Sequence, residues 1–136
     1  MQIDFCRGEE GGVEGGYGKP ARINLENRTK AFAVRIVGLV EILPKSQTSC
    51  IVGKQLIRSA TSVGANYRSA TRARSKSDFV SKIGIAEEEA DEACYWLELL
   101  RDLKLIPEEV YKSVHQEASE LTAIFVASGK TARFGR

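Results

Sequence analysis

Residues 52–70, VGKQLIRSATSVGANYRSA, carry a stripe of apolar side chains at steps of 4, 4, 3, 4 and 3. This heptad-like spacing is typical of a helix that packs along the seam of a bundle. Small residues crowd the middle of the stretch, and a helical Gly64 costs about 1 kcal/mol relative to alanine. We therefore expect a long helix from Thr48 or Ser49 to Arg74, with a neighbouring helix packed against Gly64. The stripe comprises Val52, Leu56, Ala60, Val63, Tyr67 and Ala70.

A helix is also predicted before this stretch, over residues 25–43. Asn24 is a good N-cap, because its side chain can accept a hydrogen bond from the first turn. Pro44 ends the helix, because the residue before a proline is pushed out of the α region. The six glycines before residue 19 disfavour a helix and leave little to bury, so we expect residues 1–23 to be a disordered tail.

Two further helices are predicted downstream. Ser77 is a suitable N-cap for the third helix, and Asp78 beside it is favourable at the positive helix end. Pro107 suits the first position of the fourth helix, and Gly129 is its expected C-cap. Residues 130–136 are then expected to form a basic, frayed C-terminal tail.

Together these patterns predict an all-α fold. No run of alternating apolar and polar residues indicates a strand. The links between the predicted helices are short, and short links force consecutive helices to be antiparallel. We therefore predict an up-down-up-down four-helix bundle over residues 24–129, which is one domain by size.

Composition narrows the class of protein. The three cysteines are scattered and odd in number, unlike a disulfide framework, and none of their spacings suits zinc. The first residues show no signal peptide, and no apolar run approaches the roughly 20 residues of a membrane span. We therefore expect a cytoplasmic protein without a metal, a cofactor or a membrane partner.

The chain has one histidine, His115, and Lys112 stands three residues before it. The Glu-x-x-His pairs of di-iron bundles are therefore absent. A cluster of carboxylates in the third helix could bind a cation, but such groups more often face solvent or pair with a basic neighbour. We predict no catalytic residue and a non-enzymatic protein, with a hydrolase using His115 and this cluster as a remote alternative. The cluster comprises Glu87, Glu88, Glu89, Asp91 and Glu92.

Four polar residues of the second helix step by 3, 4 and 4 and therefore share one face beside the apolar seam. Polar groups next to a core need partners. Glu89 and Glu92 of the third helix are the candidates, because either could make a charge-assisted hydrogen bond with Arg58. We predict a structural polar network, with a functional surface as the alternative. The four residues are Gln55, Arg58, Ser62 and Asn66.

Charge is unevenly distributed along the chain. Residues 54–82 carry seven basic groups and one acidic group, whereas residues 83–120 carry three basic and eleven acidic groups. Concentrated positive charge is the electrostatic footprint of nucleic-acid binding, although solvated helix ends also carry it. The turn between the second and third helices is the candidate site. Its basic residues are Arg68, Arg72, Arg74, Lys76 and Lys82.

The third helix carries a second apolar row late in its length. A helix that is apolar on two sides in a small bundle suggests a partner subunit or another protein. The predicted interface residues are Tyr95, Trp96, Leu99 and Leu103.

Two motifs give a family resemblance over about residues 25–127. Arg-Ser-Ala-x-Ser-x-x-Ala-Asn at 58–66 and Glu-x-x-Glu-x-x-x-Trp-Leu at 89–97 resemble the bacterial four-helix-bundle family of 23S rRNA intervening-sequence proteins. The resemblance implies helical bundles that assemble into homopentamers, most of them without an assigned activity. It marks Arg58, Ser62, Asn66, Glu89 and Glu92 as characteristic polar positions. The chain departs from the family at Ser69, where many members have glutamate.

A relative of this family, the accessory variability determinant of diversity-generating retroelements, is similar in fold and binds nucleic acid and a reverse transcriptase through a basic surface. With this resemblance, the basic turn predicts a non-enzymatic oligomeric bundle that binds RNA or DNA there. The alternative is an assembly or adaptor protein whose partner is another protein.

Overall fold

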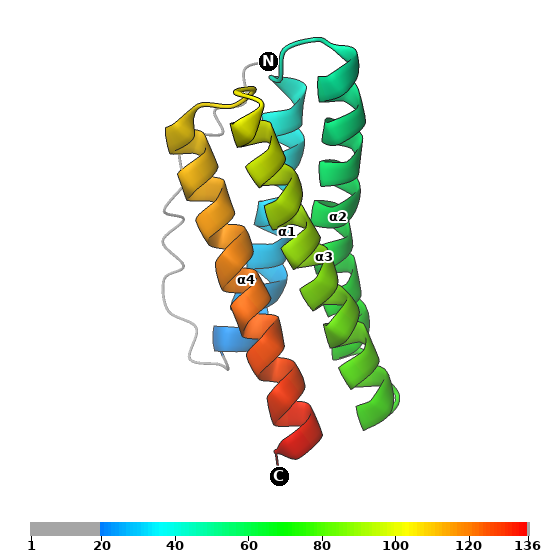
Figure 1. The fold of residues 1–136 in the computed structure, drawn as a ribbon. Coiled ribbons are helices and arrows are strands. Elements are labelled where there is room, and N and C mark those ends of the chain that lie inside the picture. Colours follow the sequence, from blue (N-terminus) through cyan, green and yellow to red (C-terminus); the bar gives the residue numbers. More distant parts are fainter. Residues whose placement is uncertain (1–19, 136) are drawn as a thin grey trace.

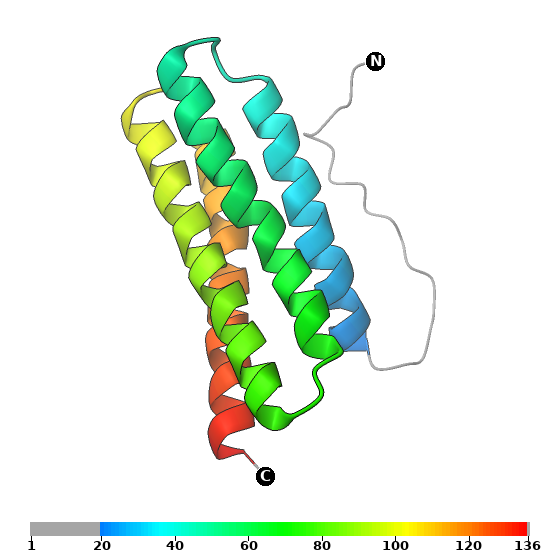
Figure 2. The same cartoon turned by 90° about the vertical axis from the view of Figure 1, so that its right-hand side faces the viewer.

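The computed structural model describes residues 20–135, with side chains from residue 25 onward. This part of the chain contains four helices and no strand: α1 (Pro20–Glu41), α2 (Gln47–Thr71), α3 (Lys76–Asp102) and α4 (Glu108–Phe134). Figures 1 and 2 show consecutive helices running in opposite directions. The predicted antiparallel four-helix bundle is confirmed.

The core is built from the stripes that the helical spacing predicts. All six stripe residues of α2 are buried, and Tyr67 packs its ring 5.9 Å from that of Phe125 in α4. Phe32 and Ile36 of α1 complete the centre with exposures of 1 % and 0 %. Each large apolar side chain buried in this way contributes about 1.5–3 kcal/mol, so tertiary packing holds these helices together.

The helix α1 depends chiefly on α2 for its position. α2 packs along both α1 and α3, and α3 packs along α4, whereas α1 touches α4 only sparingly. Where α1 and α4 do meet, the Arg28 guanidinium bonds Glu117 at 2.5 Å and Glu120 at 2.7 Å. These bonds raise the pKa of Arg28, Glu117 contributing first, although burial opposes them.

Gly64 lies where α1 approaches α2 closely, which confirms the predicted neighbour. A Cβ atom at Gly64 would lie 3.2 Å from Oγ1 and 3.5 Å from the backbone carbonyl carbon of Thr29. Thr29 is 1 % exposed, and its hydroxyl donates to the Glu26 carbonyl one turn earlier in α1. The small residue therefore allows the two helices to pack closely at this point.

The predicted beginnings of all four helices differ from the structure. α2 begins at Gln47, just before the predicted Thr48 or Ser49, and α4 begins at Glu108, because Pro107 is its extended N-cap and not its first helical residue.

α1 begins at Pro20, not after an Asn24 cap, and proline suits the first helical position, where its missing N–H is not needed. Residues 20–23 of the predicted tail are therefore helical, and residues 1–19 lie outside the described part. The N-cap of α3 is Ser75, not Ser77, because the Ser75 hydroxyl accepts a 3.0 Å bond from the Asp78 amide.

Three predicted ends differ as well. α1 ends at Glu41, two residues before the predicted end at residue 43. α2 ends at Thr71, not Arg74, because the four residues before α3 reverse the chain in a turn closed by the amides of Arg72 and Ala73. α4 continues past Gly129 to Phe134, so most of the predicted frayed tail is helical. Gly129 is buried, and a Cβ there would lie 3.8 Å from Ile83 Cγ2. Gly129 is therefore a buried interior residue of α4 and not its C-cap.

None of the four described helices combines the length and the apolarity that crossing a bilayer requires.

Candidate functional site

The basic residues predicted at the second turn lie together at one end of the bundle. Arg68 and Arg72 stand at the end of α2, Arg74 lies in the connection, and Lys76 and Lys82 occupy the first two turns of α3. All are exposed except Lys82, which is half-buried. At the end of α2, the Thr71 hydroxyl donates a hydrogen bond to the Arg68 carbonyl at 2.7 Å.

The end of α4 adds basic residues that the sequence reasoning missed. Lys76 Nζ donates to the Arg133 carbonyl at 3.4 Å, so the last turn of α4 lies beside the start of α3. Lys130 and Arg133 are both exposed. Figures 1 and 2 show the end of α4 and the α2–α3 turn at the same end of the bundle. The positive charge of residues 121–136 could have indicated this contribution. We instead expected the helix to end at Gly129, which placed Lys130 and Arg133 in a separate C-terminal tail.

We refer to this end as the basic pole. Asp78 in the first turn of α3 and Glu26, which accepts a 3.3 Å bond from Thr71, are two carboxylates at this end. Within the described chain, none of the basic side chains of the pole forms an ion pair. Their charge is therefore available to an anion from outside. The pole comprises Arg68, Arg72, Arg74, Lys76, Lys82, Lys130 and Arg133.

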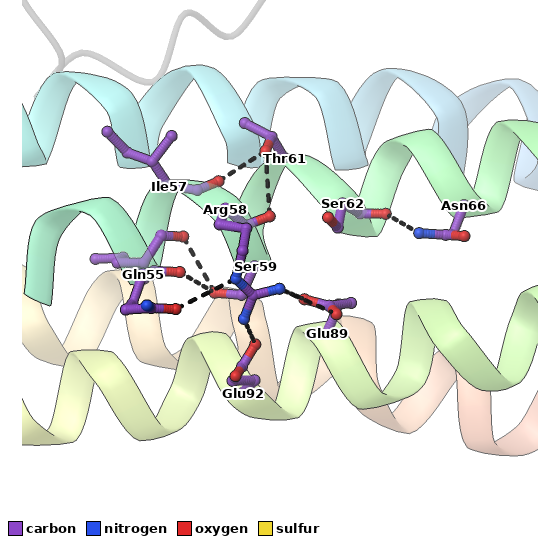
Figure 3. Close-up of polar contacts among 10 residues, drawn as sticks. Gln55, Ile57, Arg58, Ser59, Thr61, Ser62, Asn66, Glu89 and Glu92 are labelled. Atoms are coloured by element: carbon purple, nitrogen blue, oxygen red, sulfur yellow. Dashed lines mark hydrogen bonds and ion pairs between the residues drawn. The ribbon is translucent and has the colours of Figure 1, made fainter.

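The structure brings together four of the six residues of the predicted polar network (Figure 3). Arg58 Nε donates to Gln55 Oε1 at 3.2 Å, and the guanidinium bonds Glu89 at 3.2 Å and also contacts Glu92. This cluster joins α2 to α3. Ser62 and Asn66 stay apart from it: the Asn66 amide donates to the Ser62 carbonyl at 2.8 Å within α2. In Figure 3 this second contact lies farther along the helix.

Different effects dominate the pKa shifts of Arg58 and Glu89. The hydrogen bond that Arg58 donates to Glu92 is the main cause that raises the pKa of Arg58; burial opposes it, and the attraction of Glu89 adds to it. Burial raises the pKa of Glu89, and this outweighs the attraction of Arg58. The Glu89 side chain is 20 % exposed against 47 % for Arg58, so desolvation falls mainly on the carboxylate.

We expect Glu89→Gln to make the protein slightly more stable at neutral pH. A carboxyl whose pKa is raised on folding favours the folded state fully below its unfolded pKa, and this contribution is lost as pH rises through the folded pKa. Glutamine keeps an acceptor for Arg58 without the charge, so the gain at pH 7 should be below about 1 kcal/mol. The measurement is urea unfolding of both proteins between weakly acidic and neutral pH.

The gain should shrink towards zero as the pH falls, because wild-type Glu89 then takes up its proton. Glu88→Gln is the matched control, since it removes the same charge from a neighbouring, exposed position of α3. A Glu89→Gln protein that is less stable at neutral pH, with the deficit closing on acidification, would show that the attraction of Arg58 outweighs burial.

A second polar row, which the sequence did not indicate, joins α3 to α4. His115 Nε2 lies 3.1 Å from Glu98 Oε2, and the Ser119 hydroxyl lies 3.4 Å from His115 Nδ1 and 3.8 Å from Cys94 Sγ. Glu98 is outside the acidic cluster of residues 87–92, so the structure does not bring His115 to the residues of the remote hydrolase alternative. Burial raises the pKa of Cys94, which disfavours the nucleophilic thiolate.

The acidic cluster itself offers no ready metal site. Over residues 25–135, no three histidine, cysteine or carboxylate side chains are arranged to hold a metal ion. Glu89 and Glu92 are engaged by Arg58, and Glu88 and Asp91 face solvent. The arrangement thus holds helices together, and we assign it no chemistry.

The predicted interface row divides into two pairs. Tyr95 and Leu103 are 58 % and 45 % exposed, whereas Trp96 and Leu99 are half-buried and pack against the core. The Tyr95 ring meets Trp96 edge-on at 5.0 Å. The row therefore presents a partly exposed apolar surface on α3. Exposed apolar side chains outside this row are Val34, Val37, Ile42, Ile51, Ile85 and Phe134.

Comparison with known proteins identifies a family and solved structures that resemble this chain. A family model described as 23S rRNA-intervening sequence protein matches residues 22–127. A crystal structure from Bacteroides thetaiotaomicron, described as a protein with unknown function from the S23 ribosomal protein family, is 40 % identical with a TM-score of 0.74. The similarity covers 79 % of this chain and 99 % of that one. No protein with a curated description matches the chain.

Proposed function

Because the chain belongs to the 23S rRNA-intervening sequence protein family, we propose that it is a non-enzymatic, oligomeric bundle that binds RNA or DNA through the basic pole. One observation carries the proposal: basic side chains from α2, α3 and α4 gather at one end of the bundle without ion-pair partners in the described chain. Lysine and arginine that are free to displace counterions from phosphates are the main source of sequence-independent affinity for nucleic acids.

Assembly would strengthen this interaction. The apolar row of Tyr95, Trp96, Leu99 and Leu103 on α3 is the proposed contact between copies of the chain, in line with the pentamers that the family resemblance implies. Several poles on one assembly would raise avidity for a long polyanion without any new contact, provided that they can reach it simultaneously.

Binding should be strongly salt-dependent. For duplexes, the logarithm of the association constant falls with the logarithm of salt concentration with a slope of about −0.9 for each neutralised phosphate. If about four side chains of the pole contact phosphates, the slope should be near −4. The measurement is a gel-shift or anisotropy titration with a structured RNA at several salt concentrations. Undetectable binding, or binding that salt does not weaken, would contradict the proposal.

The exposed part of the apolar row favours a second candidate, an adaptor that binds another protein. Tyr95 and Leu103 are 58 % and 45 % exposed in the single chain. Light scattering of the purified protein separates the two candidates when it is combined with amide hydrogen exchange along α3. An oligomer in which the row is protected supports self-assembly, whereas a monomer, or an oligomer with the row unprotected, supports a protein partner.

A further inference from the structure

A hollow of about 550 Å³ opens at the basic pole. Its volume lies within the range of about 300–1,000 Å³ that is common for sites of small organic groups. Residues of all four helices and of the α2–α3 connection line it, so the same turn that carries the basic residues also forms its wall. The lining residues include Tyr67, Ala73, Lys76, Phe79, Ile83 and Ser128.

The lining is apolar with a polar edge. The Tyr67 side chain is 6 % exposed, and its ring centroid lies 5.9 Å from that of Phe125. This packing fixes the position of the Tyr67 ring on one side of the hollow. Phe79 is half-buried and packs against the core from α3, and Ile83 is 1 % exposed. The polar residues of the lining are Thr71, Ser75, Lys76 and Ser128. Aromatic and aliphatic walls with a few polar groups suit a flat, largely apolar group that carries hydrogen-bonding edges.

The positive charge around the hollow indicates that the bound group belongs to a negatively charged molecule. Arg72 and Arg74 flank Ala73 in the connection, and Lys130 follows Ser128 by two residues. An apolar peptide would gain nothing from this positive border, whereas a strand of nucleic acid offers phosphates for the border and a planar base for the interior. Positively charged grooves combined with aromatic side chains are the usual means of binding single strands.

We propose that the hollow receives an unpaired nucleobase while the basic pole holds the phosphates on either side of it. The protein then prefers single strands and loops to uninterrupted duplexes. This inference rests on the function proposed above, and adds which form of nucleic acid the pole selects.

The test compares one oligonucleotide as a single strand and as a blunt duplex, using the full-length wild-type protein and three variants. Ala73→Trp fills the hollow from its wall, and Phe79→Leu removes an aromatic ring but keeps an apolar side chain. Ala123→Trp is the matched control, because Ala123 is exposed on α4 outside the lining. Circular dichroism and urea unfolding verify that each protein is folded.

We expect Ala73→Trp, which fills the hollow, and Phe79→Leu, which removes the ring, each to weaken binding of the single strand about tenfold. Stacking of one base on an aromatic side chain is worth about 1–3 kcal/mol, and tenfold lies within that range. Duplex affinity and the salt dependence should stay unchanged, because the phosphate contacts remain. Ala123→Trp should match the wild type with both probes. If Ala73→Trp does not fold, Phe79→Leu alone carries the comparison.

The outcomes separate the two proposals. Salt-dependent binding with equal affinity for both probes, or equal losses on both probes in the two hollow variants, overturns the nucleobase site and leaves the basic pole as a phosphate-binding surface. Absence of binding to either probe removes the pole as a nucleic-acid site and the nucleobase site with it.

Discussion

Replacing Arg68, Arg72, Arg74 and Lys76 together with glutamine is expected to lower the affinity for a structured RNA by about two to three orders of magnitude. All four side chains are exposed and lie at the α2–α3 turn. Each lost phosphate contact costs roughly 1 kcal/mol at moderate salt and reduces the salt slope by about one. Fluorescence anisotropy at several salt concentrations measures both quantities, and the slope separates lost phosphate contacts from a general loss of affinity.

The control for this variant removes the same number of charges from elsewhere. Lys30, Lys45, Lys54 and Lys112 are exposed and lie outside the pole. Their joint replacement with glutamine changes the net charge equally, so it should alter long-range attraction but leave the phosphate contacts in place. A similar loss of affinity in both variants would show that RNA responds to overall charge and not to the pole.

The sequence alone could locate one part of the basic pole but not the other. The five basic residues around the α2–α3 turn are neighbours in the chain, so their grouping follows from local order. Lys130 and Arg133 join them only because α4 remains helical through Gly129, a glycine that is buried in contact with the rest of the bundle. Spacing within one helix carries no information about such a contact.

The helix caps show the same limit on a smaller scale. Ser75 and Ser77 are equally good N-caps by residue type. The structure selects Ser75, which bonds the Asp78 amide, so α3 begins two residues earlier than an N-cap at Ser77 would place it. The apolar stripes, by contrast, were predictable, because apolar residues that recur with a period near 3.6 specify which face of a helix is buried. This holds wherever the helix begins and ends.

The polar network was predictable in its charged part only. Arg58 reaches Glu89 and Glu92 because opposite charges on adjacent helices attract whatever the details of the backbone. Asn66 instead bonds the Ser62 carbonyl one turn earlier. A side chain that can satisfy itself on its own helix does not need a partner across the interface, and a shared helical face cannot distinguish the two outcomes.

Gly64→Leu is expected to lower the free energy of unfolding by about 3 kcal/mol, the upper end of the usual cost of overpacking. A Cβ alone would already lie 3.2 Å from Thr29 Oγ1, which is a tight contact, and 3.5 Å from the Thr29 carbonyl carbon, which is full van der Waals contact. The further atoms of a leucine would therefore meet the α1 backbone, which cannot turn aside as a flexible side chain could. A leucine therefore forces α1 away from α2. Since α1 has few contacts with α4, little else holds it in place.

Gly84 provides the matched control within α3, because a Cβ there meets nothing within 4 Å. Gly84→Leu should be neutral or stabilising by up to about 1 kcal/mol, since leucine favours the helix more than glycine does. Urea midpoints at unchanged m-values measure both changes, and faster amide exchange confined to α1 would identify the helix that loosens in Gly64→Leu. Equal effects at the two glycines would contradict the tight α1–α2 contact, because then propensity, which is the same at both positions, would outweigh the space available.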